Sequence, residues 1–151
     1  MKKCYLDTNV LLCYKNEDSP LLLESKRIIK NLLDKSFIIC VSPLILDEFL
    51  HSLQFIILRK KRIRNIYPLL KEILRDILKL PRLEIVNPPK TKIAQIKAVS
   101  IMKSYNLRPR DAYHMLTMLE NKIDIFATFD NDFRKVFKKG ILKEAIIDER
   151  G

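Results

Sequence analysis

Polar residues interrupt an apolar run almost at the start of the chain, in the segment YLDTNVLL at positions 5 to 12. Asp7, Thr8 and Asn9 are types that cap helix N-termini, because each offers a side-chain oxygen to free backbone N–H groups. An aspartate at the end of a strand can instead bind a divalent cation, provided that further acids meet it there. Such a cation activates water for hydrolysis of a phosphodiester. The chemistry of Asp7 therefore depends on which other acids reach it.

Three more acids stand where a folded chain could bring them to Asp7. Asp130 follows the apolar segment IFAT, and Asp111 opens a helical pattern. Glu48 lies in the second turn of a helix that follows another apolar segment. Four carboxylates within a few ångströms repel one another and raise at least one pKa, unless a cation neutralises them. Mg²⁺ or Mn²⁺ is the natural cation for such a set of oxygen ligands.

Short apolar segments alternate with helical patterns along the chain. We predict strands at residues 3–6, 37–41, 83–86, 123–128 and 144–148. Helices are expected after Asp7, after a helix-start signal at 18–20, from 42 to the basic stretch at 59–64, and at 68–79, 91–104, 109–121 and around 136–137. This alternation predicts an α/β fold of three layers (α/β/α), with a central parallel sheet of four to five strands between helices.

The carboxyl ends of the strands are the expected place for a site, because open parallel sheets bind ligands there, near the point where the strand order reverses. Asp7 follows the first predicted strand and Asp130 follows the strand at 123–128, so both acids should project at this edge if the two strands are neighbours. The inward stripe is predicted to include Ile56 on the helix from 42, and Leu119 on the helix at 109–121.

Length and composition predict a single domain, 1–151, with a formal net charge of +11 from 29 Lys and Arg against 18 Asp and Glu. This charge favours a polyanionic partner but does not by itself establish nucleic-acid binding. No stretch approaches the ~20 apolar residues of a membrane span, so we expect a soluble, cytoplasmic protein without a membrane partner. Cys4, Cys13 and Cys40 are expected to be reduced core thiols, because they form no C-x-x-C pair.

Three segments taken together resemble the PIN domain, and especially the small nuclease toxins of VapC type: YLDTNVLL, VSPLILDEFL and RPRDAYHMLTMLENKIDIFATFDNDF. They occur in the expected order, and the resemblance spans nearly the whole chain. It implies a central parallel sheet flanked by helices. It also implies a cluster of acids that binds Mg²⁺ or Mn²⁺ in order to hydrolyse single-stranded or structured RNA.

Matched by position, the resemblance assigns the catalytic and metal-binding roles to Asp7, Glu48, Asp111 and Asp130. It assigns supporting roles around them to Thr8, Asn9, Thr128 and Asp132. Alternatives stay open at each position. Asp7 could act only as a helix cap, Asp111 only as a first-turn acid on a helix dipole, and Asn9 and Thr128 could bond only their own turns. The helical angle does not separate Glu48 from Asp47, and Asp130 and Asp132 are both turn-forming residues.

Basic residues and histidines near these acids invite further roles. Arg108 and Arg110 flank a predicted ligand and are predicted to hold a substrate phosphate through paired donors. His114 is expected on a helix face at the rim of the site, and His51 in a structural position, because a bound cation makes a separate general base unnecessary. The basic stretch at 59–64 is either a solvated helix end or a contact with RNA or a partner.

These inferences predict a Mg²⁺- or Mn²⁺-dependent endoribonuclease whose products carry 5′-phosphate ends. The resemblance further implies a homodimer and, for toxin members, a type II toxin–antitoxin pair with a small antitoxin. Alternatives are a housekeeping RNA-processing nuclease without an antitoxin, and a catalytically silent module that binds RNA or protein. A response-regulator receiver or a haloacid-dehalogenase-like phosphatase fits poorly, because the first requires a well-placed Lys and the second an Asp-x-Asp motif.

Overall fold

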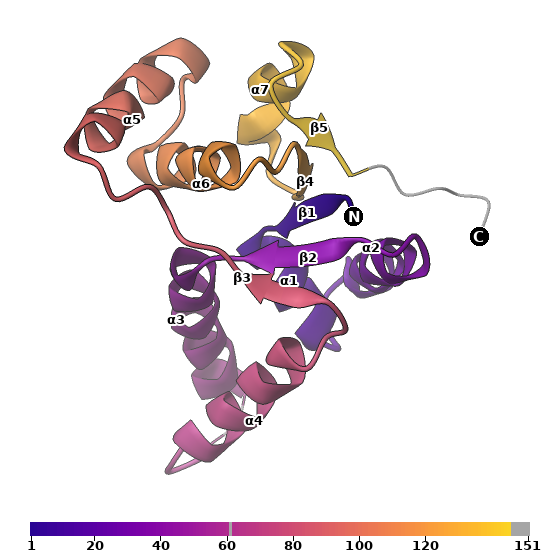
Figure 1. The fold of residues 1–151 in the computed structure, drawn as a ribbon. Coiled ribbons are helices and arrows are strands. Elements are labelled where there is room, and N and C mark those ends of the chain that lie inside the picture. The colour runs from indigo at the N-terminus through magenta and orange to yellow at the C-terminus, as the bar shows by residue number, and fades with distance from the viewer. Residues whose placement is uncertain (61, 146–151) are drawn as a thin grey trace.

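A central sheet of parallel strands organises the molecule (Figure 1). The computed structural model describes residues 1–60 and 62–145. Within these residues the sheet has five strands in the order β3-β2-β1-β4-β5, and every neighbouring pair is parallel. The strands are β1 (Lys3–Leu6), β2 (Ile38–Val41), β3 (Leu83–Ile85), β4 (Ile125–Ala127) and β5 (Lys143–Glu144). The predicted parallel sheet of four to five strands is confirmed.

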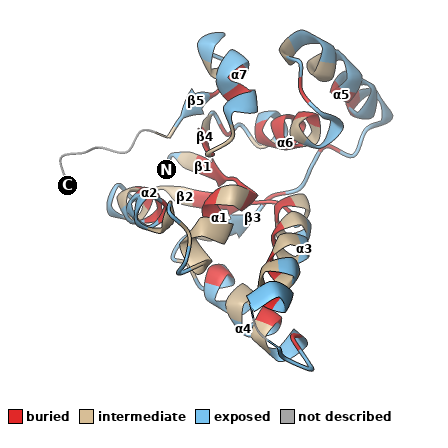
Figure 2. Ribbon diagram, turned by 180° about the vertical axis from the view of Figure 1, so that it is seen from behind, coloured by how far each residue is buried: buried red, intermediate tan, exposed pale blue. Residues whose placement is uncertain are grey.

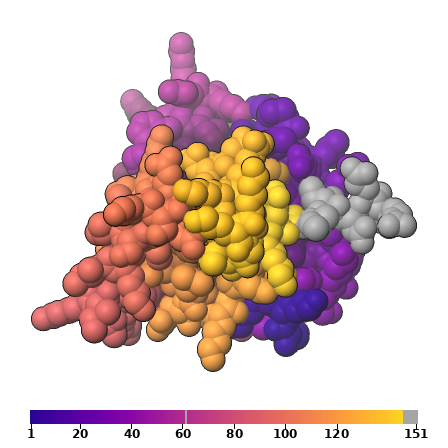
Figure 3. Space-filling view, turned by 90° about the horizontal axis from the view of Figure 1, so that it is seen from above, coloured from indigo at the N-terminus to yellow at the C-terminus, as the bar shows by residue number. Residues whose placement is uncertain are grey.

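Helices connect the strands and flank the sheet. They are α1 (Thr8–Lys15), α2 (Leu22–Asp34), α3 (Pro43–Lys60), α4 (Tyr67–Leu78), α5 (Lys92–Tyr105), α6 (Pro109–Glu120) and α7 (Arg134–Lys138). The first of them packs against α2 and α3, and α5 packs against α6. Because crossovers between parallel strands are right-handed, the helices before β3 and those after it cover opposite faces. Seen from above, α5, α6 and α7 together form the surface toward the viewer (Figure 3). The predicted three-layer fold is confirmed.

The strand order reverses between β1 and β4, which are neighbours in the sheet although most of the chain separates them. Leu6 pairs with Ala127, so the segments that follow the two strands leave the sheet side by side. The backbone N–H of Asp7 extends the ladder by donating to the Ala127 carbonyl at 2.9 Å. The condition for bringing the acids after these strands to one edge is therefore met.

The middle of the sheet is among the most deeply buried parts of the molecule (Figure 2). Tyr5 of β1 and Phe126 of β4 are fully buried, and their ring centroids lie 5.7 Å apart. Phe126 also packs edge-on against Phe133, which follows β4 in the chain. Since buried aromatic rings contribute much of the stabilisation of a core, β1 and β4 form a well-packed platform for the side chains at their ends.

Two predicted core positions are wrong. The buried residues of α3 recur at steps of four, and Ile57 occupies the position that was predicted for Ile56, which is only half buried. On α6, Leu119 is 46% exposed. Met118 takes the buried position in the last turn of that helix instead, so the inward stripe turns away from Leu119.

Several predicted element boundaries also differ from the structure by one or more residues. The helix expected after the start signal at 18–20 begins at Leu22, and its N-cap residue, Leu21, makes no side-chain cap hydrogen bond. Of the last predicted strand, Glu144 ends β5 and Ala145 follows it, whereas positions 146–148 lie outside the described residues. The strand therefore begins one residue earlier than predicted, at Lys143.

The three cysteines are free thiols, as predicted, but only two belong to the core. Burial raises the pKa of Cys4 to about 12 and that of Cys40 to about 11, so both keep their protons and are poor nucleophiles. Cys13 is partly exposed. Among the helices that the structure describes, none has the length and apolar character needed to span a membrane.

Candidate active site

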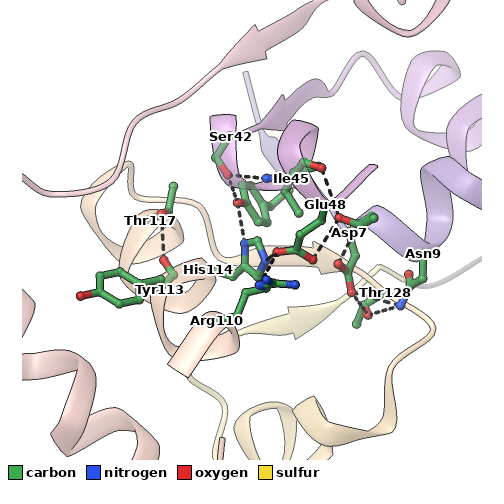
Figure 4. A network of polar contacts seen from close by, with 12 residues as sticks. Asp7, Asn9, Ser42, Ile45, Glu48, Arg110, Tyr113, His114, Thr117 and Thr128 are labelled. Atoms are coloured by element: carbon green, nitrogen blue, oxygen red, sulfur yellow. Dashed lines mark hydrogen bonds and ion pairs between the residues drawn. The ribbon is translucent and has the colours of Figure 1, made fainter. Parts of the chain in front are cut away.

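The carboxylate of Asp7 is held at the end of β1 by three neighbours (Figure 4). Its Oδ1 accepts a hydrogen bond from the backbone N–H of Thr8 (2.7 Å) at the start of α1. Its Oδ2 accepts from the side chains of Asn9 (3.1 Å) and Thr128 (2.5 Å). Only 8% of Asp7 is exposed. Asp7 does cap a helix, as the simpler alternative proposed, but two side chains also fix its second oxygen at the sheet edge.

Asn9 and Thr128 join the loop after β1 to the loop after β4. The Asn9 side chain donates to Thr128 Oγ1 (3.3 Å) and accepts from the backbone N–H of Phe129 (3.2 Å). The same Thr128 oxygen accepts from the backbone N–H of Asp130 (2.9 Å), within its own turn. Asn9 therefore bonds across the two loops and not only its own turn, whereas Thr128 does both.

Three acids from α6 and from the loop after β4 form a second group. One carboxylate oxygen from each of Asp111, Asp130 and Asp132 lies within 4.8 Å of the other two. Asp130 also caps a short 3₁₀ helix, because its Oδ1 accepts from the backbone N–H of Asp132 (2.9 Å). Asp132 was predicted to support the ligands, yet its carboxylate reaches the same centre as the other two. We refer to these three acids as the outer trio.

Local sequence determines where Asp111 stands. Asn106 ends α5 in the left-handed conformation (φ 53°), which asparagine adopts more readily than most residues. Pro109 is the first residue of α6, where a missing N–H costs no helical hydrogen bond. Asp111 then falls in the first turn of that helix, where the dipole favours a negative charge. The helix start thus offsets part of the repulsion within the outer trio.

Glu48 reaches the sheet edge from α3. Its Oε1 lies 2.7 Å from His114 Nε2 and 3.6 Å from Arg110 Nε. Its Oε2 accepts from Thr8 Oγ1 at 3.4 Å. Asp47, the alternative at this position, is exposed and lines a groove between α3 and α4. The structure therefore brings Glu48, and not Asp47, to the other acids.

Burial and mutual repulsion raise the pKa of two of these acids. The pKa of Asp7 is raised mainly by burial and also by the charge of Glu48, although the hydrogen bond from Thr128 opposes the rise. The pKa of Asp111 is raised by burial and then by the charge of Asp130. A cation among the acids would relieve this repulsion. The donors are all carboxylate oxygens, which suits a hard divalent cation.

Comparison with known proteins decides the family. The sequence profile of the PIN domain matches residues 4–139. This chain belongs to the PIN domain family. Ribonuclease VapC6 of Methanocaldococcus jannaschii is 29% identical to this PIN domain over 132 aligned residues, which cover 80% of this chain and 86% of the relative. The resemblance seen in the three sequence segments is confirmed.

Crystal structures of other proteins share the fold of this PIN domain. VapC20 of Mycobacterium tuberculosis, a sarcin-ricin loop cleaving toxin, matches it with a TM-score of 0.61 at 17% identity, over 88% of this chain and 94% of that chain. VapBC2 of Rickettsia felis, bound to a DNA fragment from their promoter, matches it with a TM-score of 0.63 at 16% identity, over 94% and 96%. At these identities the likeness concerns the fold.

Exposed arginines lie near some of the acids of this PIN domain. Arg110 is 61% exposed and contacts Glu48 through Nε, and Arg108 is exposed just before the first residue of α6. Their predicted contact with a substrate phosphate stays a prediction. Arg134, which the sequence-based prediction missed, lines a hollow together with Asp130. It comes from α7, so exposed arginines of α6 and α7 lie beside two of the acids, Glu48 and Asp130.

The basic stretch at 59–64 is partly tied to its own chain. Lys60, at the end of α3, donates hydrogen bonds to Asn16 (3.0 Å) and Asp18 (2.5 Å) in the loop after α1. Position 61 lies outside the described residues. Lys60 is therefore not simply solvated, because it binds residues of its own chain. The alternative contact of the basic stretch with RNA or a partner stays a prediction.

His114 was predicted to lie at the rim of the site, and this prediction is wrong. The structure places it beneath the acids. Only 2% of it is exposed, and its two ring nitrogens contact Glu48 Oε1 (2.7 Å) and the Tyr5 hydroxyl (3.0 Å). A signal was present in the sequence, because His114 stands among the apolar residues of α6 at the spacing that faces the sheet. His51, in contrast, is exposed and packs against Phe55.

Proposed function

We propose that this PIN domain is an endoribonuclease that depends on Mg²⁺ or Mn²⁺ and acts as the toxin of a toxin–antitoxin pair. One observation carries the proposal: acids stand where β1 and β4 end, at the point of strand reversal, with Asp111, Asp130 and Asp132 within 4.8 Å of one another and Glu48 joined through Thr8 to the end of β1. Membership of the PIN domain family and the similarity to Ribonuclease VapC6 support it.

The acids form a donor set that fits a hard cation. We propose that Asp111 and Asp130 hold it, together with Asp132, because these three already offer oxygens within 4.8 Å of one another. Asp7 and Glu48 stand at the same sheet edge and complete the set that the family resemblance implies. When bound, the cation supplies activation of water and stabilises the negative charge that develops on the phosphodiester.

Other residues of the chain orient the acids and attract the substrate. Asn9 and Thr128 hold the second oxygen of Asp7, which keeps its carboxylate from rotating away from the site. Arg110 carries an exposed guanidinium beside Glu48, in a position to bind a substrate phosphate through paired donors. The net charge of +11 draws RNA toward the protein. Products with 5′-phosphate ends are expected.

We further propose two protein partners, a small antitoxin and a second copy of this chain. The likeness of the fold to VapBC2 of Rickettsia felis supports the first. A basic side chain from an antitoxin would silence the acids, because a positive charge relieves their repulsion and occupies the place of the cation. Co-purification of this chain with the product of the adjoining reading frame tests the pair. Independent migration of the two proteins would contradict it.

Cleavage of RNA by matched variants tests the enzymatic proposal. The wild type should cleave single-stranded and structured RNA with Mg²⁺ or Mn²⁺ and stop when EDTA is added. Asp7→Asn should lose this activity, because it removes a negative charge from the site. Its fold should persist, because asparagine can still cap the helix. Asp47→Asn, which removes a charge one residue away from Glu48 on α3, should remain active. Equal activity of Asp7→Asn and the wild type would contradict the proposal.

A further inference from the structure

A network of buried, hydrogen-bonded polar groups connects the core to Glu48 (Figure 4). The cation chemistry proposed above does not use this network. Ser42 Oγ lies 2.6 Å from the Tyr5 hydroxyl, which lies 3.0 Å from His114 Nδ1. His114 Nε2 lies 2.7 Å from Glu48 Oε1. Ser42, Tyr5 and His114 are each at most 2% exposed. Polar groups this deeply buried need partners, and each of them has one.

The donors and acceptors of this hydrogen-bond network can be assigned in one consistent direction. A carboxylate only accepts hydrogen bonds, so the ring proton of His114 lies on Nε2 and points at Glu48. With the imidazole neutral, Nδ1 accepts from the Tyr5 hydroxyl, and Tyr5 accepts from Ser42. Ser42 Oγ in turn accepts from the backbone N–H of Ile45 (3.3 Å), at the start of α3. This assignment, which follows from the hydrogen-bond network, leaves neither hydroxyl hydrogen without an acceptor.

This hydrogen-bond network joins residues from four parts of the fold. Tyr5 comes from β1, Ser42 from the position between β2 and α3, His114 from α6 and Glu48 from α3. The rings of Tyr5 and His114 also pack against each other, with centroids 5.8 Å apart and planes inclined by 55°. The imidazole is therefore fixed both by its hydrogen bonds and by its packing, and it presents Nε2 to Glu48 in one orientation.

We propose that His114 is a positioning residue, which together with Tyr5 and Ser42 fixes the Glu48 carboxylate where the metal site requires it. The inference rests on the proposed function, because Glu48 belongs to the set of acids proposed there for the cation. A glutamate side chain has several rotatable bonds, and a donor held in the core selects one of their combinations before a cation arrives. Arg110 is no substitute, since its 3.6 Å contact comes from a side chain that is 61% exposed.

A matched set of variants separates positioning from a merely structural role. His114→Gln carries an amide nitrogen near the place of Nε2 and can still donate to Glu48, whereas His114→Asn reaches only as far as Nδ1. Tyr5→Phe keeps the buried ring and removes only the hydroxyl that orients His114. His51→Asn changes the other histidine, which is exposed on α3. Mn²⁺ binding to the metal-stripped proteins, measured by calorimetry below every melting temperature, is the readout.

Loss of the donor should weaken Mn²⁺ binding of His114→Asn by about 10- to 100-fold, the usual effect of removing a partner of a metal ligand. His114→Gln should restore most of the affinity, Tyr5→Phe should lose a smaller part of it, and His51→Asn should match the wild type. If Tyr5→Phe and His114→Asn melt earlier but bind Mn²⁺ as tightly as the wild type, the positioning role is wrong. If His114→Asn does not fold, wild-type affinity in Tyr5→Phe still overturns the inference.

The two proposals fail in different ways. A wild type that binds Mn²⁺ but cleaves no RNA would contradict the proposed function, while the affinities of the variants still decide the role of His114. A wild type that cleaves RNA, with affinities that do not depend on His114 or Tyr5, would contradict the positioning role alone.

Discussion

In the absence of a divalent metal ion, replacing Asp111 by Asn should raise the free energy of unfolding of the protein. The oxygens of the outer trio lie within 4.8 Å of one another. At that separation two unit charges repel by about 1 kcal/mol in water and by about 3.5 kcal/mol at a dielectric constant of 20. Asp111 is only partly exposed, whereas Asp132 is exposed, so we use the lower value, that for water, for these solvent-screened charges. Two repulsions give about 2 kcal/mol, and the lost interaction with the helix dipole removes about 0.5 kcal/mol of that gain.

The net gain of about 1.5 kcal/mol corresponds to a melting temperature about 3 to 6 °C above that of the wild type in EDTA, for a chain of this size. Mg²⁺ should reverse the order. At a hundred times its dissociation constant, a ligand stabilises a folded protein by about 2.7 kcal/mol. The wild type should gain this stabilisation, whereas Asp111→Asn should gain little of it. Scanning calorimetry with EDTA and then with MgCl₂ measures both effects.

Asp47→Asn is the control for a general effect of charge, because it removes one negative charge from an exposed position of α3. It should shift as the wild type does when Mg²⁺ is added. The reasoning is refuted if Asp111→Asn melts below the wild type in EDTA, or if Mg²⁺ raises the melting temperatures of both proteins equally.

Three further predictions concern the substrate, the pH and the core. Arg110→Ala should weaken RNA binding in EDTA and lower the slope of log K against log salt by about 1; an unchanged slope in a filter-binding titration would contradict the phosphate contact. The pKa values of Asp7 and Asp111 are raised, so as the pH falls protons compete with Mg²⁺ for these carboxylates at a higher pH than for ordinary ones. The Mg²⁺-induced rise in melting temperature should therefore shrink from neutral to mildly acidic pH. A rise that stays constant over this range would contradict the prediction. Phe126→Ala should cost about 3–5 kcal/mol in urea unfolding; a cost under about 1 kcal/mol would show that the β1–β4 platform is not central.

Sequence rules were sufficient where the position of a residue follows from the strand that precedes it. Asp7 and Asp130 follow two apolar strands, and parallel strands end at one edge, so their proximity required only that β1 and β4 be neighbours. The register of Leu6 with Ala127 meets that condition. The start of α6 was equally readable, since Pro109 marks its first position and so places Asp111 in the first turn.

Features that depend on contacts between distant elements were not readable in the same way. The helical spacing gives the face of His114 but not its partners, because Tyr5 and Glu48 come from β1 and α3. The choice between Glu48 and Asp47 depends on the rotation of α3 against the sheet, which neighbouring positions on a helix do not reveal. Asp132 was given a supporting role because nothing in the turn sequence shows which of its carboxylates faces α6.

Anomalous diffraction from crystals grown with Mn²⁺ tests the central claim most directly. We predict a peak within bonding distance of Asp111 and Asp130, on the side of the sheet edge that Asp7 and Glu48 also face. In crystals of Asp111→Asn grown in the same way, the peak should weaken or vanish. Absence of a peak from the wild type, or a peak bound only to residues away from this edge, would contradict the account.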